Sequence, residues 1–279
     1  MYKYGVNLLL WTSTFTQKNL NLFPLVKNLG LDVVEIPLFN PEIVPAEKVK
    51  KELKKYDLEA CGCYGCSPDA DIASLDKNIR KRGIERFKNA VEKAHMIGAK
   101  KIGGVVYKAG GVFTGSAPTN EEWTFSVNSM REITQYAHQY DISICIEPVN
   151  RYETYFINTA QDAVKYCKDV DEPNISVLLD THHLNIEESS FCDPIINTNH
   201  YLKHFHASEN NRGTPGSGLV DWIQVYKALK HINYKGPIII ESFYLGFGNI
   251  WKKVAKSPKS LLSEGLIFLK NVEQEVFQG

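Results

Sequence analysis

Short apolar runs alternate along the chain with segments in which apolar residues recur every three or four positions. The runs are rich in β-branched residues and are bounded mostly by Gly, Asp, Asn or Pro, as buried parallel strands are. They cover residues 4–10, 33–38, 59–64, 101–107, 143–149, 175–181, 204–208 and 238–243. Between them, residues 45–56 place Val49, Leu53 and Tyr56 on one helical face. The pattern therefore predicts strands that alternate with helices.

Two further helices have recognisable ends. Residues 76–98 form a long charged segment that closes with a glycine, and Asn120 opens a helix with Glu121 and Glu122 in its first turn. Eight strand–helix units in roughly 250 residues match a (β/α)₈ TIM barrel. No linker or change in composition divides the chain, so we expect a single TIM-barrel domain over residues 1–279. A doubly wound open sheet is the alternative, with its ligand at one switch point.

Four of the predicted strands carry a polar side chain near the end. These are Glu147 in SICIEPVN, Asp180 in ISVLLDTHH, His206 in HFHAS and Glu241 in IIIESF. Catalytic groups of such barrels gather at the C-terminal ends of the strands. A charge in an apolar strand costs several kcal/mol unless it is paired or bound to a metal. Each residue alone fits a salt bridge or a helix cap equally well, whereas four in register favour a common site.

Three carboxylates and one imidazole suit a hard or borderline divalent ion with six-fold coordination. We expect Mn²⁺, with Co²⁺ or Mg²⁺ as alternatives. Four protein ligands leave two positions for water or for two neighbouring oxygens of a substrate. Glu153, His183 and Arg212 follow these strands in loops, where they could hold hydroxyl groups of a small hydrophilic ligand or form loop salt bridges.

Four stretches resemble the ketose 3-epimerases, the family of D-tagatose, D-allulose and L-ribulose 3-epimerases. They are CIEPVNRYETYFIN at 145–158, LLDTHHLNIEESSF at 178–191, HFHASENNRGTPGSG at 204–218 and INYKGPIIIESF at 232–243. The resemblance is dense from about residue 142 to residue 243, and weaker but continuous from residue 4 to the segment around residue 102. That family has a xylose isomerase-like TIM barrel, in agreement with the strand–helix pattern.

The resemblance implies roles for individual residues. It makes Glu147, Asp180, His206 and Glu241 the metal ligands, with Glu147 and Glu241 also the acid/base pair at C3. It implies that the substrate is held by a further set, which comprises Glu153, His183, Arg212, Trp11 and Asn7.

The chain departs from the family pattern at three places. Asn7 stands where many members have tyrosine, His182 stands where many have phenylalanine, and the segment 107–113 lacks a tryptophan-containing pattern. In the family these positions line the far end of the sugar, so they bear on the choice of substrate.

The predicted reaction is metal-dependent epimerisation of free ketoses at C3, such as D-tagatose, D-fructose or D-allulose, and L-ribulose. Two glutamates remove and return the proton through an enediolate. An aldose–ketose isomerase of the same barrel family is one alternative, and a non-catalytic sugar-binding barrel is another. A nuclease on this barrel would need a zinc cluster with more His and Asp ligands. No lysine-rich phosphate cradle follows the last two strands, which argues against phosphorylated substrates.

The overall composition is that of an ordinary globular protein, with 43% hydrophobic and 23% charged residues. Because 32 basic residues balance 32 acidic ones, a nucleic-acid partner held by a general basic field is not expected. No run of 18 apolar residues is present, so we expect neither a membrane-spanning helix nor a membrane partner.

The chain has six cysteines, several of them inside apolar runs, which predicts reduced thiols and a cytoplasmic location. Cys61, Cys63 and Cys66 resemble half of a zinc site but have no second pair, so core or loop thiols are the favoured interpretation. The apolar and aromatic residues of 268–277 fit either closure of the barrel or a subunit contact, and we expect a homodimer or homotetramer.

Overall fold

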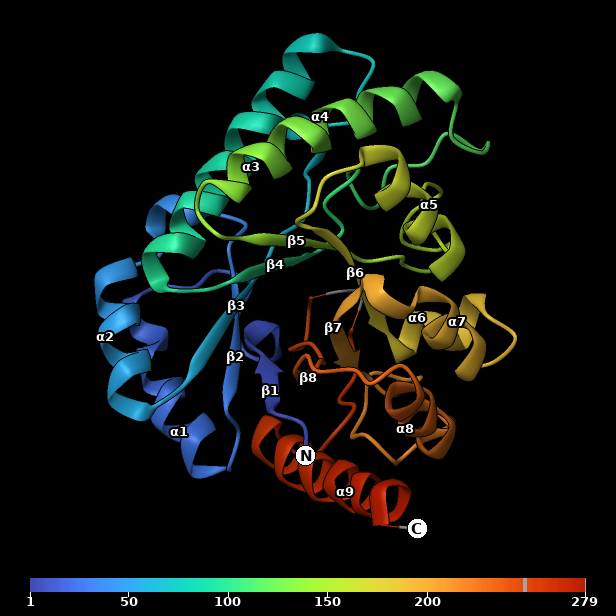
Figure 1. Ribbon diagram of the computed structural model, residues 1–279. Coiled ribbons are helices and arrows are strands. Elements are labelled where there is room, and N and C mark those ends of the chain that lie inside the picture. Colours follow the sequence, from blue (N-terminus) through green and yellow to red (C-terminus); the bar gives the residue numbers. More distant parts are fainter. Residues whose placement is uncertain (248–249, 279) are drawn as a thin grey trace.

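The computed structural model describes residues 1–247 and 250–278. Eight parallel strands follow one another in chain order around a closed barrel, and β8 pairs with β1 to complete it (Figure 1). The predicted (β/α)₈ barrel is therefore confirmed, and the open doubly wound sheet is excluded. The strands are β1 (Tyr4–Asn7), β2 (Val33–Pro37), β3 (Glu59–Cys63), β4 (Lys101–Gly104), β5 (Ser143–Ile146), β6 (Ile175–Asp180), β7 (Leu202–Ala207) and β8 (Ile238–Ile240).

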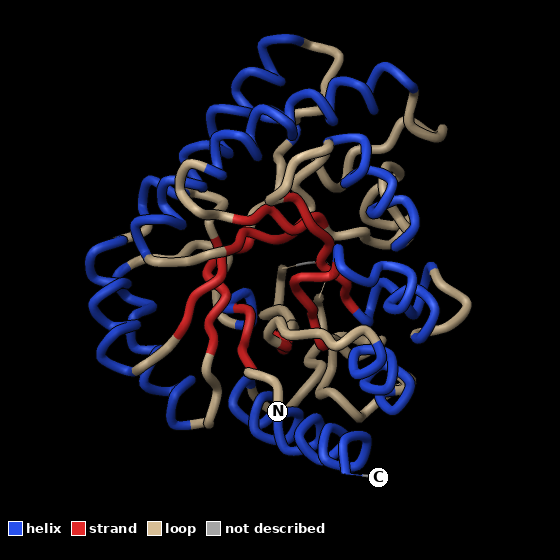
Figure 2. Tube along the Cα trace, in the orientation of Figure 1, coloured by secondary structure: helices blue, strands red, loops and turns tan. Residues whose placement is uncertain are grey.

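Helices surround the strands on the outside of the barrel (Figure 2). They are α1 (Leu22–Asn28), α2 (Ala46–Tyr56), α3 (Lys77–Ile97), α4 (Asn120–His138), α5 (Ala160–Val170), α6 (Thr181–Glu187), α7 (Cys192–Thr198), α8 (Trp222–His231) and α9 (Pro258–Gln278). The last helix packs beside the N-terminus, where Glu273 Oε1 accepts a hydrogen bond of 2.6 Å from the Tyr2 amide. The start and the end of the chain thus meet at the N-terminal end of the barrel.

The predicted helix ends are explained by local capping. The Asp76 carboxylate accepts from the second and third amides of α3, and Gly98 ends this helix with a φ of 87°. Thr119 and Glu122 form a reciprocal capping box at the start of α4. These caps satisfy amide groups that have no partner inside a helix, so the chain enters and leaves both helices at defined residues.

Every strand ends one to three residues earlier than predicted, and local geometry explains two of these ends, those of β1 and β4. The prediction that the first strand extends to residue 10 is wrong, because the Asn7 side chain accepts from the Leu9 amide and Leu8–Leu10 form a 3₁₀ helix. The fourth strand ends at Gly104 instead of continuing to residue 107. Gly104 has a φ of 127°, and a Cβ atom there would lie 2.3 Å from the Tyr64 carbonyl oxygen. Both strands therefore turn away early and leave room at the barrel mouth.

Strand residues are buried on both sides, between the barrel interior and the surrounding helices. Cys61, Cys63 and Cys66 are buried free thiols in and just after β3, which confirms their interpretation as core or loop thiols. Across the described ranges, no helix is both long enough and apolar enough to span a bilayer.

Candidate active site

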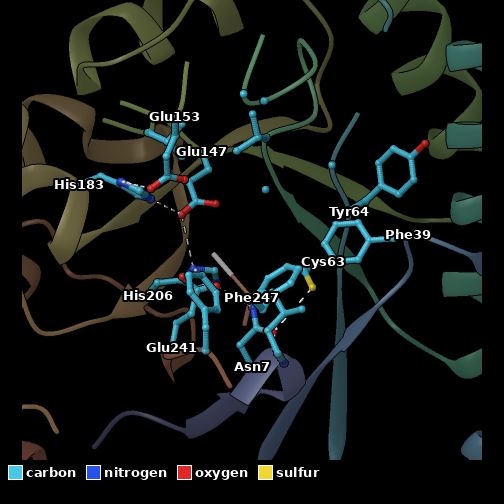
Figure 3. A pocket seen from close by; sticks show the side chains of 18 of the residues that line it. Asn7, Phe39, Cys63, Tyr64, Glu147, Glu153, His183, His206, Glu241 and Phe247 are labelled. Carbon is cyan, nitrogen blue, oxygen red and sulfur yellow. Dashed lines mark hydrogen bonds and ion pairs between the residues drawn. The ribbon is translucent and has the colours of Figure 1, made fainter. Parts of the chain in front are cut away.

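A cavity of about 510 Å³ opens at the C-terminal ends of the strands (Figure 3). Its size falls in the range of pockets that enclose small ligands. One end is polar, with charged side chains from β5 to β8 and the following loops, and the other end is largely apolar. The polar end includes Asn7, Glu147, Glu153, His183, His206, Arg212 and Glu241.

The four residues predicted as metal ligands lie together at the polar end. Glu147 and Glu241 directly follow β5 and β8, where the sheet ends. Asp180 is the last residue of β6, and it pairs in register with His206 of β7. Asp180 also caps α6, since its Oδ1 accepts a hydrogen bond of 2.7 Å from the His182 amide. One ligand atom from each of the four residues lies within 4.8 Å of the others.

The imidazole of His206 lies at the centre of this cluster. Its Nδ1 atom is 3.4 Å from Glu241 Oε1, 3.6 Å from Glu147 Oε1 and 3.8 Å from Asp180 Oδ2. In the described part of the chain, His206 Nδ1 and Glu147 Oε1 are buried without a hydrogen-bond partner. Buried polar atoms are normally satisfied, so unsatisfied acceptors that converge from two strands fit a bound cation. The donor set of three carboxylates and one imidazole fits a divalent ion.

Arg212 lies in the loop after β7 and binds two of the four predicted metal ligands. Its Nη1 atom donates to Asp180 Oδ2 and to Glu241 Oε2, both at 2.7 Å, and to Ser208 Oγ at 2.8 Å. Burial opposes the charge of Asp180, but the neighbouring guanidinium outweighs it and holds the pKa of Asp180 well below its usual range. Arg212 therefore keeps Asp180 ionised and links β6 to β8.

Glu153 and His183 lie on the side of the cavity formed by β5 and β6. The Asn150 amide group Nδ2 lies 2.9 Å from both Glu153 Oε1 and His183 Nδ1. His183 Nε2 is 3.7 Å from Glu147 Oε1. Burial lowers the pKa of His183 well below its usual value and raises the pKa of Glu153. The imidazole is consequently neutral, and Asn150 joins it to Glu153.

Glu147 and His206 have opposite pKa shifts. Burial raises the pKa of Glu147 to about 8, although His206 offsets part of this effect. Burial lowers the pKa of His206, but the adjacent Glu241 and Glu35 carboxylates outweigh it and raise that pKa well above its usual value. A carboxyl group with a pKa close to neutrality is suited to proton transfer.

Glu35 on β2 was missed by the sequence analysis. It is completely buried and contacts His204, His206 and Asn7 through hydrogen bonds. The signal was present in the strand VVEIP, where one acid interrupts an apolar run as Glu241 does. Glu35 was not predicted as a site residue because it lies in the middle of its strand and not at the end.

Trp11 and Asn7, the two residues near the first strand that were expected to hold substrate, have different surroundings. Trp11 follows the 3₁₀ helix Leu8–Leu10, packs against the hydrophobic core and is not among the described residues that line the cavity. Asn7 does line the cavity, but its Nδ2 atom donates to Glu35 Oε1 at 3.0 Å and to Glu241 Oε1 at 2.8 Å. The amide group of Asn7 is thus engaged by protein carboxylates.

The apolar end of the cavity comes mainly from the first half of the barrel. Phe39 and Tyr64 lie across the cavity from the metal-ligand cluster (Figure 3), and the centre of the Phe247 ring lies 6.5 Å from that of Phe39. Gly110 and Gly111, in the segment that lacks a tryptophan-containing pattern, also line the cavity, and the Gly111 amide donates to the Glu153 carbonyl oxygen at 2.8 Å. A Cβ atom added at Gly110 would have only the Glu153 carbonyl oxygen within 4 Å, at 3.8 Å, whereas Gly111 has a φ of 73° that favours glycine.

The arrangement can be compared with known proteins. A model of the family described as xylose isomerase-like TIM barrel matches residues 23–272. The chain belongs to this family. A ketose 3-epimerase from Arthrobacter globiformis is 34% identical over 242 residues, which cover 86% of this chain and 83% of the relative. An L-ribulose 3-epimerase from Methylomonas sp. strain DH-1 is 31% identical over 277 residues, which cover 96% of each chain.

Solved structures of ketose 3-epimerases are similar over nearly the whole chain. The D-allulose 3-epimerase of Methylomonas sp. in complex with D-allulose has a TM-score of 0.92 and 30% identity, and the match covers 97% of this chain and 96% of the other. The D-psicose 3-epimerase of Clostridium cellulolyticum H10 with D-tagatose has a TM-score of 0.88, 28% identity and coverage of 97% and 99%. These relatives confirm the resemblance to ketose 3-epimerases and the prediction of an enzyme of the isomerase class.

Proposed function

We propose that this protein epimerises free ketoses at C3 with a divalent metal ion, and that Glu147 and Glu241 exchange the proton. One observation carries the proposal: two glutamates from β5 and β8 meet His206 and Asp180 within 4.8 Å at the polar end of the cavity. The relatives named as ketose 3-epimerases support the reaction class. Free ketoses such as D-tagatose, D-fructose, D-allulose and L-ribulose are the proposed substrates.

Inversion at C3 requires removal of a proton from one face and delivery of a proton to the other. A divalent ion held by Glu147, Asp180, His206 and Glu241 would supply a Lewis acid for the C2 carbonyl. Glu147 and Glu241 come from strands three positions apart around the barrel, and they approach from different sides in Figure 3. One carboxylate takes the C3 proton and the other carboxyl returns a proton on the opposite face, with the roles exchanged in the reverse direction.

The remaining polar residues would hold the hydroxyl end of the sugar. Arg212 and His183 present nitrogen atoms to the cavity between the two glutamates, and Glu153 lies beside His183. Their positions are kept by Asp180 and Asn150, so they orient C1 to C3 without large rearrangement. The apolar end, with Phe39 and Tyr64, would accept C4 to C6 with few specific contacts.

Mn²⁺ is the proposed ion, with Co²⁺ or Mg²⁺ as alternatives, because the ligand set mixes hard oxygens with one imidazole. A homodimer or homotetramer is the proposed assembly.

The deciding experiment is turnover in D₂O with Mn²⁺-loaded enzyme and a panel of free ketopentoses and ketohexoses. Exchange with a carboxylate places solvent deuterium at C3 of the product, which nuclear magnetic resonance locates directly. An aldose–ketose isomerase would instead label C1 or C2, and a non-catalytic sugar-binding barrel would bind ketoses without turnover. Either of those results would reject the proposed epimerisation.

A further inference from the structure

Glu35 is a completely buried carboxylate that lies behind the metal-ligand cluster. It comes from the middle of β2, on the opposite side of the barrel from β5 and β6. A buried carboxylate costs several kcal/mol unless its oxygens accept hydrogen bonds from charged or polar donors. The hydrogen-bond partners of Glu35 therefore indicate its role.

Three side chains bond to the two Glu35 oxygens. His206 Nε2 lies 3.1 Å from Oε1 and 3.2 Å from Oε2, and His204 Nε2 contacts Oε2. Asn7 Nδ2 donates to Oε1 at 3.0 Å. Both histidines come from β7, and Asn7 ends β1, so Glu35 joins two regions of the barrel wall.

The contact with His206 determines which ring nitrogen faces the cluster. A carboxylate only accepts hydrogen bonds, so the Nε2 atom of His206 carries the proton in this contact. The opposite nitrogen, Nδ1, then faces Glu241, Glu147 and Asp180, where it would offer its lone pair to a bound metal ion. A second hydrogen-bond partner that fixes the tautomer and the ring orientation is a general requirement of a histidine that binds a metal.

Asn7 extends the same arrangement to Glu241. Its Nδ2 group has two hydrogens, one for Glu35 Oε1 at 3.0 Å and one for Glu241 Oε1 at 2.8 Å. Its Oδ1 atom accepts from the Leu9 amide at 3.0 Å, which fixes the orientation of the side-chain amide. One oxygen of Glu241 is consequently held by Asn7 while the other accepts from Arg212.

We infer that Glu35 and Asn7 form a positioning pair for the metal centre, in which Glu35 orients His206 and Asn7 orients Glu241. The inference rests on the proposed metal-dependent function. It assigns Asn7 a role toward Glu241 in place of a direct contact with substrate. Neither residue of the pair is a metal ligand, so both act through the ligands that they hold.

The first test measures Mn²⁺ binding without turnover. Metal-free protein is titrated with Mn²⁺, and the free ion is followed by electron paramagnetic resonance. Glu35→Gln should weaken Mn²⁺ affinity by about 10–100-fold, because in either orientation of the amide an NH₂ donor replaces one of the two oxygens that accept from His206 Nε2. Glu273→Gln is the matched control, since Glu273 is also a buried carboxylate but bonds Tyr2 and Tyr4 at the other end of the barrel. This control should bind Mn²⁺ as the wild type does.

A second pair of variants is used if circular dichroism shows that Glu35→Gln does not fold. His204→Leu removes one donor to Glu35 without altering a metal ligand, and it should weaken Mn²⁺ affinity by about 10-fold. His204→Gln keeps an N–H donor and should restore most of the affinity. Wild-type affinity in folded Glu35→Gln, or in His204→Leu if only that variant folds, overturns the role of Glu35.

Asn7→Asp tests the contact with Glu241. This substitution keeps the oxygen that accepts from Leu9 but replaces the donor with a carboxylate facing two others. We expect kcat to fall by about 100-fold at saturating Mn²⁺, with KM little changed. An unchanged kcat overturns the role of Asn7. If the wild type itself binds no Mn²⁺, the proposed function fails first, whereas normal wild-type binding with unaffected variants rejects only the positioning pair.

Discussion

Glu147 Oε1 and His206 Nδ1 face each other at 3.6 Å in the barrel interior, and neither has a hydrogen-bond partner among residues 1–247 and 250–278. This separation is too long for a hydrogen bond, yet both atoms are shielded from water. Glu241 and Asp180 surround the same imidazole nitrogen. The four side chains thus converge on one point from four consecutive strands, which is the geometry that the proposed metal centre needs.

Removal of the metal should abolish activity. We expect dialysis against a chelator to eliminate epimerisation, and Mn²⁺ or Co²⁺ to restore it, because the ligand set suits these ions. Binding to the native state alone should also stabilise the fold by about 2.7 kcal/mol at a concentration 100 times Kd. Product analysis and thermal unfolding with and without Mn²⁺ check both effects. Full turnover by metal-free enzyme would reject the mechanism.

The two proposed acid/base residues should behave differently from the residues proposed to hold substrate. Glu147→Gln and Glu241→Gln each remove a ligand charge and a proton-transfer group, so we expect kcat to fall by more than the roughly 10²–10⁴-fold typical of acid/base catalysis alone.

Glu153→Ala is the comparison variant on the side of the cavity near His183. It should change KM as well as kcat while Mn²⁺ binding remains close to that of the wild type. Arg212→Ala should change the same two constants, and it also frees Asp180 and Glu241 from their shared partner. Steady-state kinetics and Mn²⁺ titrations distinguish the acid/base variants from the substrate-binding variants. An equal loss of Mn²⁺ affinity in all four variants would contradict this difference.

The loop after β4 should influence substrate choice. Gly110 lines the cavity beside the Glu153 carbonyl oxygen and has space around it, so Gly110→Trp should fold and narrow the cavity. We expect kcat/KM for ketohexoses to fall relative to ketopentoses by about 10–200-fold, the range for one altered apolar contact. Thr114→Trp, at an exposed position of the same loop, is the control. If Gly110→Trp and Thr114→Trp changed kcat/KM for ketohexoses and ketopentoses to the same extent, Gly110 would have no role in substrate specificity.

Acid should weaken a buried ion network near the cavity. Lys108 Nζ lies 3.0 Å from Asp71 Oδ2 and 3.7 Å from Glu122 Oε1, and Tyr155 donates to the same oxygen of Glu122. Burial opposes the charge of Glu122, but the hydrogen bonds from Tyr155 and Thr119 and the charge of Lys108 outweigh it and lower its pKa.

A lowered pKa in the folded state means that Glu122 adds stability above its ordinary value of 4.5, and that this stability is lost as the pH falls through the lower folded value. The Gln side chain in Glu122→Gln can keep the capping box but not the charge. We therefore expect the free energy of unfolding of the wild type to fall more steeply below pH 4.5 than that of the variant. Urea unfolding between pH 3 and 7 measures the difference, and parallel curves would contradict it.

Much of the fold could be predicted because its signals are local. Buried strands show as apolar runs. The end of α3 shows as Gly98, and the start of α4 shows as the acids Glu121 and Glu122 in its first turn. Glu147, Asp180, His206 and Glu241 could be grouped because parallel strands of a barrel end at the same face. The eightfold alternation alone was enough to bring them to one site.

Only the tertiary structure decided what surrounds that site. Glu35 lies 171 positions from His206 in the chain, and Asn7 lies 234 positions from Glu241, so no local pattern links either pair. Trp11 is partly buried against the hydrophobic core, directly after the 3₁₀ helix that follows β1. The sequence by itself determined that the four polar residues of the site come near the ends of consecutive strands. The pairing of β8 with β1 determined which buried side chains contact these residues, because hydrogen bonds between distant strands depend on the completed barrel.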